Sequence, residues 1–218
     1  MTAASGGFAG RLREATTPDH AEAESSGFLD RLLGDAVDLL AYRLLVVQHL
    51  AIYGALEAAM AGLASDRVVA SFHDPRLERV PALEADLAWL RGQGGAGLEE
   101  VLPATEAYVQ RIGEVAASWP AGLVAHPYTR YLGGLSGGIL IGRVLDGHLD
   151  GGTAFYRCER IDDPKGWKDA YRSRLDAAPW DAAEQSRIVG EVSRAYALNR
   201  SVLADLERRA VAASAAAP

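Results

Sequence analysis

The stretch HPYTRYLGGLSGGILIG, residues 126–142, decides the fold. It has the apolar spacing of a helix, yet five of its seventeen residues are glycine. Each glycine inside a helix costs about 1 kcal/mol relative to alanine. A helix keeps so many glycines where its backbone must bend or must approach another group closely.

Three explanations compete for these glycines. A phosphate-binding loop would need a preceding strand and a following lysine with serine or threonine, but Ile139 and Leu140 follow instead. Gly134, Gly138 and Gly142 lie four residues apart, which is the spacing that lets two helices pack closely. The third explanation is a bent helix whose bare backbone lies against a flat ligand. The spacing alone leaves the last two open.

Most of the remaining sequence also has helical periodicity, so we expect an all-α fold in a single domain over residues 1–218, with flexible ends at 1–7 and 211–218. Thr17 and Pro18 carry the signals of a helix start, which predicts a break in the first helix. A long apolar helix is expected over about 36–63, and a kink at Pro127. Asp181 and Glu184 have the spacing of a capping box before the last helix.

Composition limits the possible partners. The formal net charge of −7 argues against a nucleic acid or an anionic membrane surface as the main partner. Cys158 is the only cysteine, which excludes an intramolecular disulfide and fits a reducing compartment. No signal peptide and no run of 18 apolar residues stands out. We therefore expect a cytoplasmic protein that does not cross a membrane.

A ligand-holding residue is best sought among the five histidines, His20, His49, His73, His126 and His148. No HExxH motif and no zinc-type pair occurs among them. His20 differs from the others because Glu24 follows one helical turn later and could orient its ring. A single histidine with an open opposite face is what a heme iron needs.

Two basic residues add to this pattern. Lys168 and Arg172 lie four residues apart, on one helical face, where they could meet two carboxylates. A solvated charged face explains the same spacing. Heme carries two propionates, which would give the pair a purpose.

Taken together, these residues resemble the heme oxygenase family in its biliverdin-producing, α-helical form. The resemblance covers nearly the whole chain, through LREAT, IYGALE, LEADLAWL, VAHPYTRYLGGLSGG, WKDAYRSRLD and AYALN. It implies one helical domain that holds heme b, as substrate and prosthetic group, between a proximal helix and a kinked glycine-rich distal helix. The implied reaction uses dioxygen and reducing equivalents to cleave the porphyrin into biliverdin, carbon monoxide and ferrous iron. A ferredoxin or a flavoprotein reductase is the expected electron donor.

The resemblance also implies roles for individual residues. His20 matches the proximal iron ligand and Glu24 its orienting neighbour. Gly133 and Gly137 match the distal glycines that contact the heme face. The remaining matches are heme-binding residues, Arg13, Tyr128, Ser136, Lys168 and Arg172, and members of a distal hydrogen-bond network, Tyr53, Arg130 and Asn199.

The sequence departs from the family at Gly134, because the family motif normally reads YLGDLSGG. The usual aspartate organises the distal waters, and its loss removes the main polar anchor of that network. The network could survive through Tyr53, Arg130, Asn199 and extra water, which is the outcome we favour. Alternatively, the protein binds heme as a carrier, sensor or peroxidase and is impaired in ring cleavage. A di-iron site is disfavoured because the chain contains no Glu-x-x-His pair.

Overall fold

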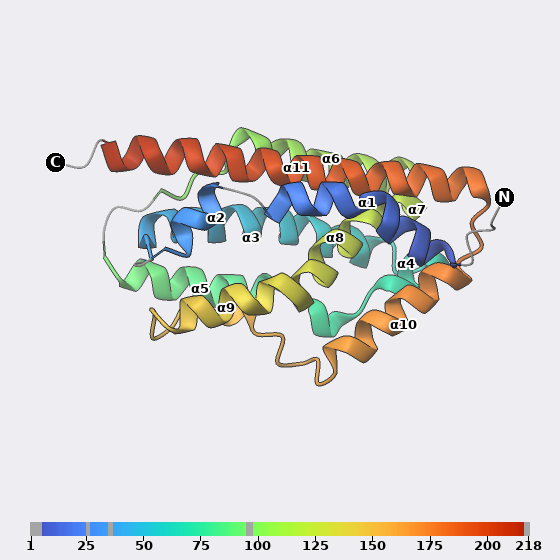
Figure 1. Ribbon diagram of the computed structural model, residues 1–218, viewed down its shortest axis with the longest axis horizontal. Coiled ribbons are helices and arrows are strands. Elements are labelled where there is room, and N and C mark those ends of the chain that lie inside the picture. Colours follow the sequence, from blue (N-terminus) through green and yellow to red (C-terminus); the bar gives the residue numbers. More distant parts are fainter. Residues whose placement is uncertain (1–5, 25–26, 35–36, 95–97, 216–218) are drawn as a thin grey trace.

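The computed structural model describes residues 6–24, 27–34, 37–94 and 98–215. Within these ranges the chain forms helices joined by short connections and contains no β-strand, which confirms the all-α prediction (Figure 1). The elements in chain order are α1 (Phe8–Glu24), α2 (Gly27–Leu32), α3 (Leu39–Gly62), α4 (Arg67–Phe72), η1 (Pro75–Leu77), α5 (Val80–Gly92), α6 (Pro103–Ser118), α7 (Pro120–Leu123), α8 (Ala125–Gly133), η2 (Gly134–Gly138), α9 (Ile139–Asp146), η3 (Ala154–Tyr156), α10 (Pro164–Ala177) and α11 (Ala182–Ala215). The described part of the 211–218 end is therefore helical.

Aspartate side chains fix where several helices begin. Asp38 Oδ1 accepts hydrogen bonds from two backbone N–H groups in the first turn of α3, at 3.0 and 3.1 Å. Asp66 and Asp163 cap α4 and α10 in the same way. Asp181 Oδ1 accepts from Glu184 N at 2.8 Å, at the start of α11. Each cap gives a partner to an N–H group that the helix itself leaves unpaired.

The core is a connected cluster of buried apolar side chains around α3. Helix α3 packs against α5 and α6, and the long α11 packs against α1, α6 and α8 (Figure 1). By length and hydropathy alone α3 could cross a membrane, but 50% of the window that passes this test is buried inside the protein. A buried core helix meets the same criteria, so α3 is explained by its place in the fold.

Helix α1 runs through Pro18 without a break, so the predicted helix start at that position is wrong. Thr17 does not act as a cap: its Oγ1 donates to the Arg13 carbonyl at 2.8 Å, and Thr16 makes the equivalent bond one residue earlier. These hydroxyls use carbonyls of the turn that precedes the proline. Arg13 and His20 therefore lie on one helix.

The glycine-rich stretch consists of α8, the π-helical turn η2 and α9. Pro127 is the third residue of α8, in the first turn, where helix N–H groups lack partners within their own helix. The expected kink at Pro127 is therefore wrong. The regular α-helical hydrogen bonding is interrupted at Gly134–Gly138 instead, where the backbone forms a π turn. Such turns are rare and often occur at functional sites.

Gly142 is required by packing, and this gives a first prediction. A Cβ at position 142 would lie 2.6 Å from Tyr156 Cβ, which belongs to the neighbouring η3. Gly142→Ala should therefore overpack this contact at a cost of about 1–3 kcal/mol, which outweighs its better helix propensity. Urea unfolding followed by circular dichroism measures the loss.

Gly190 is the matched control, because it lies inside α11 and a Cβ there would meet nothing within 4 Å. Gly190→Ala should stabilise the protein by about 1 kcal/mol. Equal stabilisation by both substitutions would contradict the packing role of Gly142.

Candidate heme-binding site

Two cavities meet at the glycine-rich helix and form one cleft. The first, the aromatic cavity, encloses about 1000 Å³ including open solvent. The second, the basic cavity, encloses about 1020 Å³, which also includes open solvent. His20, Gly133 and Tyr196 line both. The aromatic cavity is lined by His20, Ala23, Leu29, Leu45, His49, Tyr53, Tyr108, Thr129, Arg130, Gly133, Gly134, Gly137, Gly138, Ile141, Phe155, Tyr156, Tyr196, Asn199 and Leu203. The basic cavity is lined by Arg13, Thr16, Thr17, His20, Tyr128, Leu132, Gly133, Ser136, Lys168, Arg172 and Tyr196.

His20 lies on α1 where the two cavities join, and its side chain is exposed. Its ring lies 5.8 Å from the ring of Tyr196 on α11, at an interplanar angle of 76°. Arg200 of α11 approaches Asp19 Oδ1 at 3.7 Å and so helps to hold α1 against α11. The side chain of Glu24 lies outside the described residues, so its contact with His20 remains a prediction.

Positive charge gathers on the basic cavity. Arg13 of α1 and both Lys168 and Arg172 of α10 line it, so the two basic residues predicted to share a helix face do so. Lys168 Nζ donates to Ser136 Oγ at 2.8 Å, a neutral partner. Arg172 pairs with Asp169 at 2.7 Å on its own helix, where both side chains are exposed enough for water to screen the pair. Among the described lining residues there is no carboxylate, so this cavity suits an anionic ligand.

The far wall of the aromatic cavity holds a positive charge that has no counter-ion in the described part of the chain. The Arg130 guanidinium lies 5.8 Å from the centre of the Tyr53 ring and 4.9 Å from that of Tyr108. Its Nε and Nη2 atoms are buried and donate to no acceptor in the described ranges. Burial raises the pKa of Tyr53 to about 12, although the charge of Arg130 opposes the shift. The Tyr53 hydroxyl therefore stays protonated at neutral pH.

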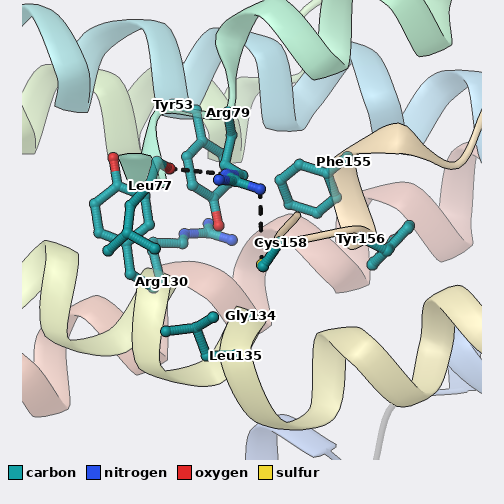
Figure 2. A pocket seen from close by; sticks show the side chains of 10 residues that line it. Tyr53, Leu77, Arg79, Arg130, Gly134, Leu135, Phe155, Tyr156 and Cys158 are labelled. Atoms are coloured by element: carbon teal, nitrogen blue, oxygen red, sulfur yellow. Dashed lines mark hydrogen bonds between the residues drawn. The ribbon is translucent and has the colours of Figure 1, made fainter. Parts of the chain in front are cut away.

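Gly134 stands between the aromatic cavity and a smaller side chamber, shown in Figure 2. The chamber encloses about 280 Å³ including open solvent and shares Tyr53, Arg130 and Gly134 with the aromatic cavity. On its other side Arg79 donates to the Leu77 carbonyl at 2.8 Å. A Cβ at position 134 would meet nothing within 4 Å, so no neighbour fills the place of the missing side chain.

These features can be compared with known proteins. The heme oxygenase family model matches residues 6–205. The chain is 38% identical over 203 residues to heme oxygenase 1 of Synechocystis sp., covering 92% of this chain and 85% of the relative. The chain belongs to the heme oxygenase family.

Solved structures of family members agree in fold. The structure of Synechocystis heme oxygenase-1 in complex with heme is 37% identical, has a TM-score of 0.87 and is matched over 96% of both chains. The heme oxygenase of Leptospira interrogans is 31% identical, has a TM-score of 0.83 and is matched over 91% of this chain and 98% of its own. The likeness therefore extends over nearly the whole fold.

The cleft brings together the residues that the resemblance singled out. Tyr53, Arg130, Gly137 and Asn199 line the aromatic cavity, whereas Arg13, Tyr128, Ser136, Lys168 and Arg172 line the basic cavity. They come from five elements that are distant in sequence, α1, α3, α8 with η2, α10 and α11. Their individual roles remain predictions.

The sequence reasoning gave no role to several lining residues, of which His49 lies beside Tyr53 and Tyr108 beside Arg130. His49 was counted among the histidines without a role, and Tyr108 was not considered, yet both line the aromatic cavity. A signal existed for His49, because it precedes Tyr53 by four residues and therefore shares its helix face. Tyr108 lies on α6, and no local spacing connects it to the site.

The cleft fits heme in shape and in chemistry. His20 offers an imidazole to the iron at the boundary of the two cavities. Gly133 lines both cavities as well and leaves open space, because a Cβ there would meet nothing within 4 Å. The aromatic cavity supplies apolar surface for a porphyrin, and the basic cavity supplies cations for two propionates. Each part of the ligand thus has a matching surface.

The basic cavity yields a second prediction. Lys168→Ala removes a cation that has only neutral partners, so the dissociation constant for heme should rise about tenfold, which corresponds to about 1.4 kcal/mol. Titration of the apoprotein with heme, followed at the Soret band, measures this change. Lys165 is the control, because it lies on the same helix but is exposed and pairs with Asp169. A loss in Lys165→Ala as large as in Lys168→Ala would contradict a specific contact.

Proposed function

We propose that the protein is a heme oxygenase that cleaves heme b to biliverdin, carbon monoxide and ferrous iron, using dioxygen and reducing equivalents. The observation that carries the proposal is the cleft: His20 and Gly133 line both of its cavities, and three basic residues line one of them. Membership of the heme oxygenase family supports the same activity.

The residues of the cleft have different roles in binding heme. Heme, when bound, supplies the iron that takes up dioxygen and the ring carbon that is oxidised. His20 holds the iron from one face, with Glu24 as its orienting neighbour. Arg13, Lys168 and Arg172 bind the propionates and so fix the rotation of the ring in the cleft. That rotation determines which ring carbon faces the reacting side.

The opposite wall controls access and protons. Gly133 and Gly137 present backbone without side chains, so the ring can lie close to η2. Tyr53, which stays protonated, can donate a hydrogen bond to water in the aromatic cavity, and Arg130 can donate through its unpaired Nε and Nη2 atoms. Asn199 lines the same cavity and can both donate and accept. These groups hold water next to the reacting side.

The glycine at position 134 is also compatible with a second function. Because no side chain occupies the place of the usual aspartate, the protein could bind heme as a carrier, sensor or peroxidase without efficient ring cleavage. Reconstitution with heme, followed by ferredoxin with its reductase or by ascorbate, separates the two functions. Cleavage bleaches the Soret band and releases biliverdin and carbon monoxide. A stable Soret complex without carbon monoxide would leave only heme binding, and the absence of any complex would refute both.

The proposal also covers the domain organisation, the compartment and the electron donor. The chain acts as one domain over residues 1–218 in the cytoplasm and takes electrons from a ferredoxin or a flavoprotein reductase. The connected hydrophobic core supports the single domain.

A further inference from the structure

The aromatic cavity has donors but lacks a carboxylate. Among the described residues that line it there is no aspartate or glutamate. Arg130 can only donate hydrogen bonds, and Tyr53 keeps its proton. Asn199 also lines the cavity and can accept as well as donate. The charged acceptor that the aspartate normal for the family would supply at position 134 is missing.

His49 is positioned to supply a hydrogen-bond acceptor to the water in this cavity. It lies on α3, four residues before Tyr53, and lines the aromatic cavity. Its ring is 5.0 Å from the ring of Phe155 and 6.1 Å from that of Tyr53, so aromatic neighbours flank it on two sides. In the described part of the chain its ring nitrogens make no hydrogen bond or ion pair, and neither is sealed from the cavity. They remain available to water or to a bound ligand.

The charge state of His49 suits this task. Burial and then the nearby charge of Arg130 lower its pKa to about 3. The ring is therefore neutral at physiological pH, with one nitrogen that donates and one that accepts. A neutral imidazole can donate to one water or ligand and accept from another, whereas Arg130 and a protonated histidine can only donate.

We propose that His49 is the distal positioning residue of this protein and that its imidazole anchors the water of the aromatic cavity in place of the carboxylate missing at Gly134. The inference rests on the proposed function, because it concerns the side of the cleft where heme would react. His49 acts through water and ligand, and it does not hold the iron. Position 134 lacks the polar group that is usual in the family, and His49 provides a polar group in the same cavity.

Fluoride binding to the ferric heme complex tests this proposal, since bound fluoride accepts hydrogen bonds from the distal side. His49→Leu removes the polar group and suits the apolar wall, so the Soret complex should form normally. The dissociation constant for fluoride should rise about three- to tenfold, as expected for one lost hydrogen bond. His49→Gln retains an amide donor and acceptor and should restore most of the affinity. His148→Leu, which alters an exposed histidine on the loop after α9, should leave it unchanged.

A second measurement tests the pairing with Gly134. His49→Leu should lower the yield of biliverdin per heme, and Gly134→Asp in that background should restore it. In the wild-type background Gly134→Asp should change the yield little, because His49 already holds the water.

The outcomes are separable. A wild-type protein that forms no Soret complex refutes the proposed function and this inference with it. A normal complex whose fluoride affinity is the same within twofold in wild type and His49→Leu overturns the inference alone. Failure of His49→Gln to recover affinity, with an intact Soret band, also overturns it, because a purely steric role would then explain the loss.

Discussion

His20→Ala should abolish heme oxygenase activity and change the spectrum of the heme complex. The imidazole of His20 is the group in the cleft that we assign to the iron, and it lies where the aromatic and basic cavities join. Without it the iron loses its protein ligand, although apolar contacts and basic residues can still hold the porphyrin. We therefore expect residual heme binding, a shifted Soret band and no biliverdin.

Absorption and electron paramagnetic resonance spectra of the reconstituted variant measure this effect. Added imidazole should enter the space left by the side chain and recover the original Soret position. His148→Ala is the control, because His148 is exposed and its Nδ1 lies 2.9 Å from the Val144 carbonyl of α9, away from the cleft. A His20→Ala complex with the wild-type spectrum would show that another residue binds the iron.

Gly133→Leu should weaken heme binding while leaving the fold intact. In the structure a Cβ at position 133 meets nothing within 4 Å, so the first atom of the new side chain clashes with nothing in the protein without ligand. That room belongs to both cavities and is the place where a porphyrin would lie against the helix. Overpacking of about 1–3 kcal/mol in the complex should raise the dissociation constant for heme by about 10- to 100-fold.

Thermal unfolding and heme titration together test this expectation. The melting temperature of the apoprotein should stay near the wild-type value, whereas the Soret titration should weaken. Gly113→Leu provides the control, because Gly113 lies exposed on α6, outside the cleft, and a Cβ there also meets nothing within 4 Å. Unchanged heme affinity in Gly133→Leu would mean that the helix does not approach the porphyrin closely.

The helical class and the start of several helices could be predicted because both depend on local sequence. Periodicity of apolar residues and the aspartate caps act within a few residues of chain, and α3 and α11 begin close to where those signals place them. Pro18 and Pro127 were misjudged for a related reason. A proline removes one helix hydrogen bond, and whether the helix continues depends on how it packs in the fold; α1 packs against α11 and α10.

Some residues of the candidate site could also be predicted from local sequence, and others could not. Residue types and short spacings, supported by the family resemblance, indicated His20, Lys168, Arg172 and the glycines. Local spacing placed His49 on the same helix face as Tyr53 but assigned it no role. Its significance depends on α3 and η2 facing the same cavity, and positions 49 and 134 are far apart in the chain.

The sequence by itself determined an all-α heme oxygenase fold and the residues that match a heme site, because these follow from local periodicity and from a long, specific motif. Only the tertiary structure decided that the helix is interrupted by a π turn at Gly134–Gly138 and that the basic and aromatic surfaces join at His20. It also decided that Arg130 finds no counter-ion among the described residues and that His49 lines the same cavity. The physical reason is that burial, charge and free hydrogen-bonding capacity depend on side chains from separate helices. The sequence pattern of one helix does not show which polar groups on the other helices lack hydrogen-bond partners.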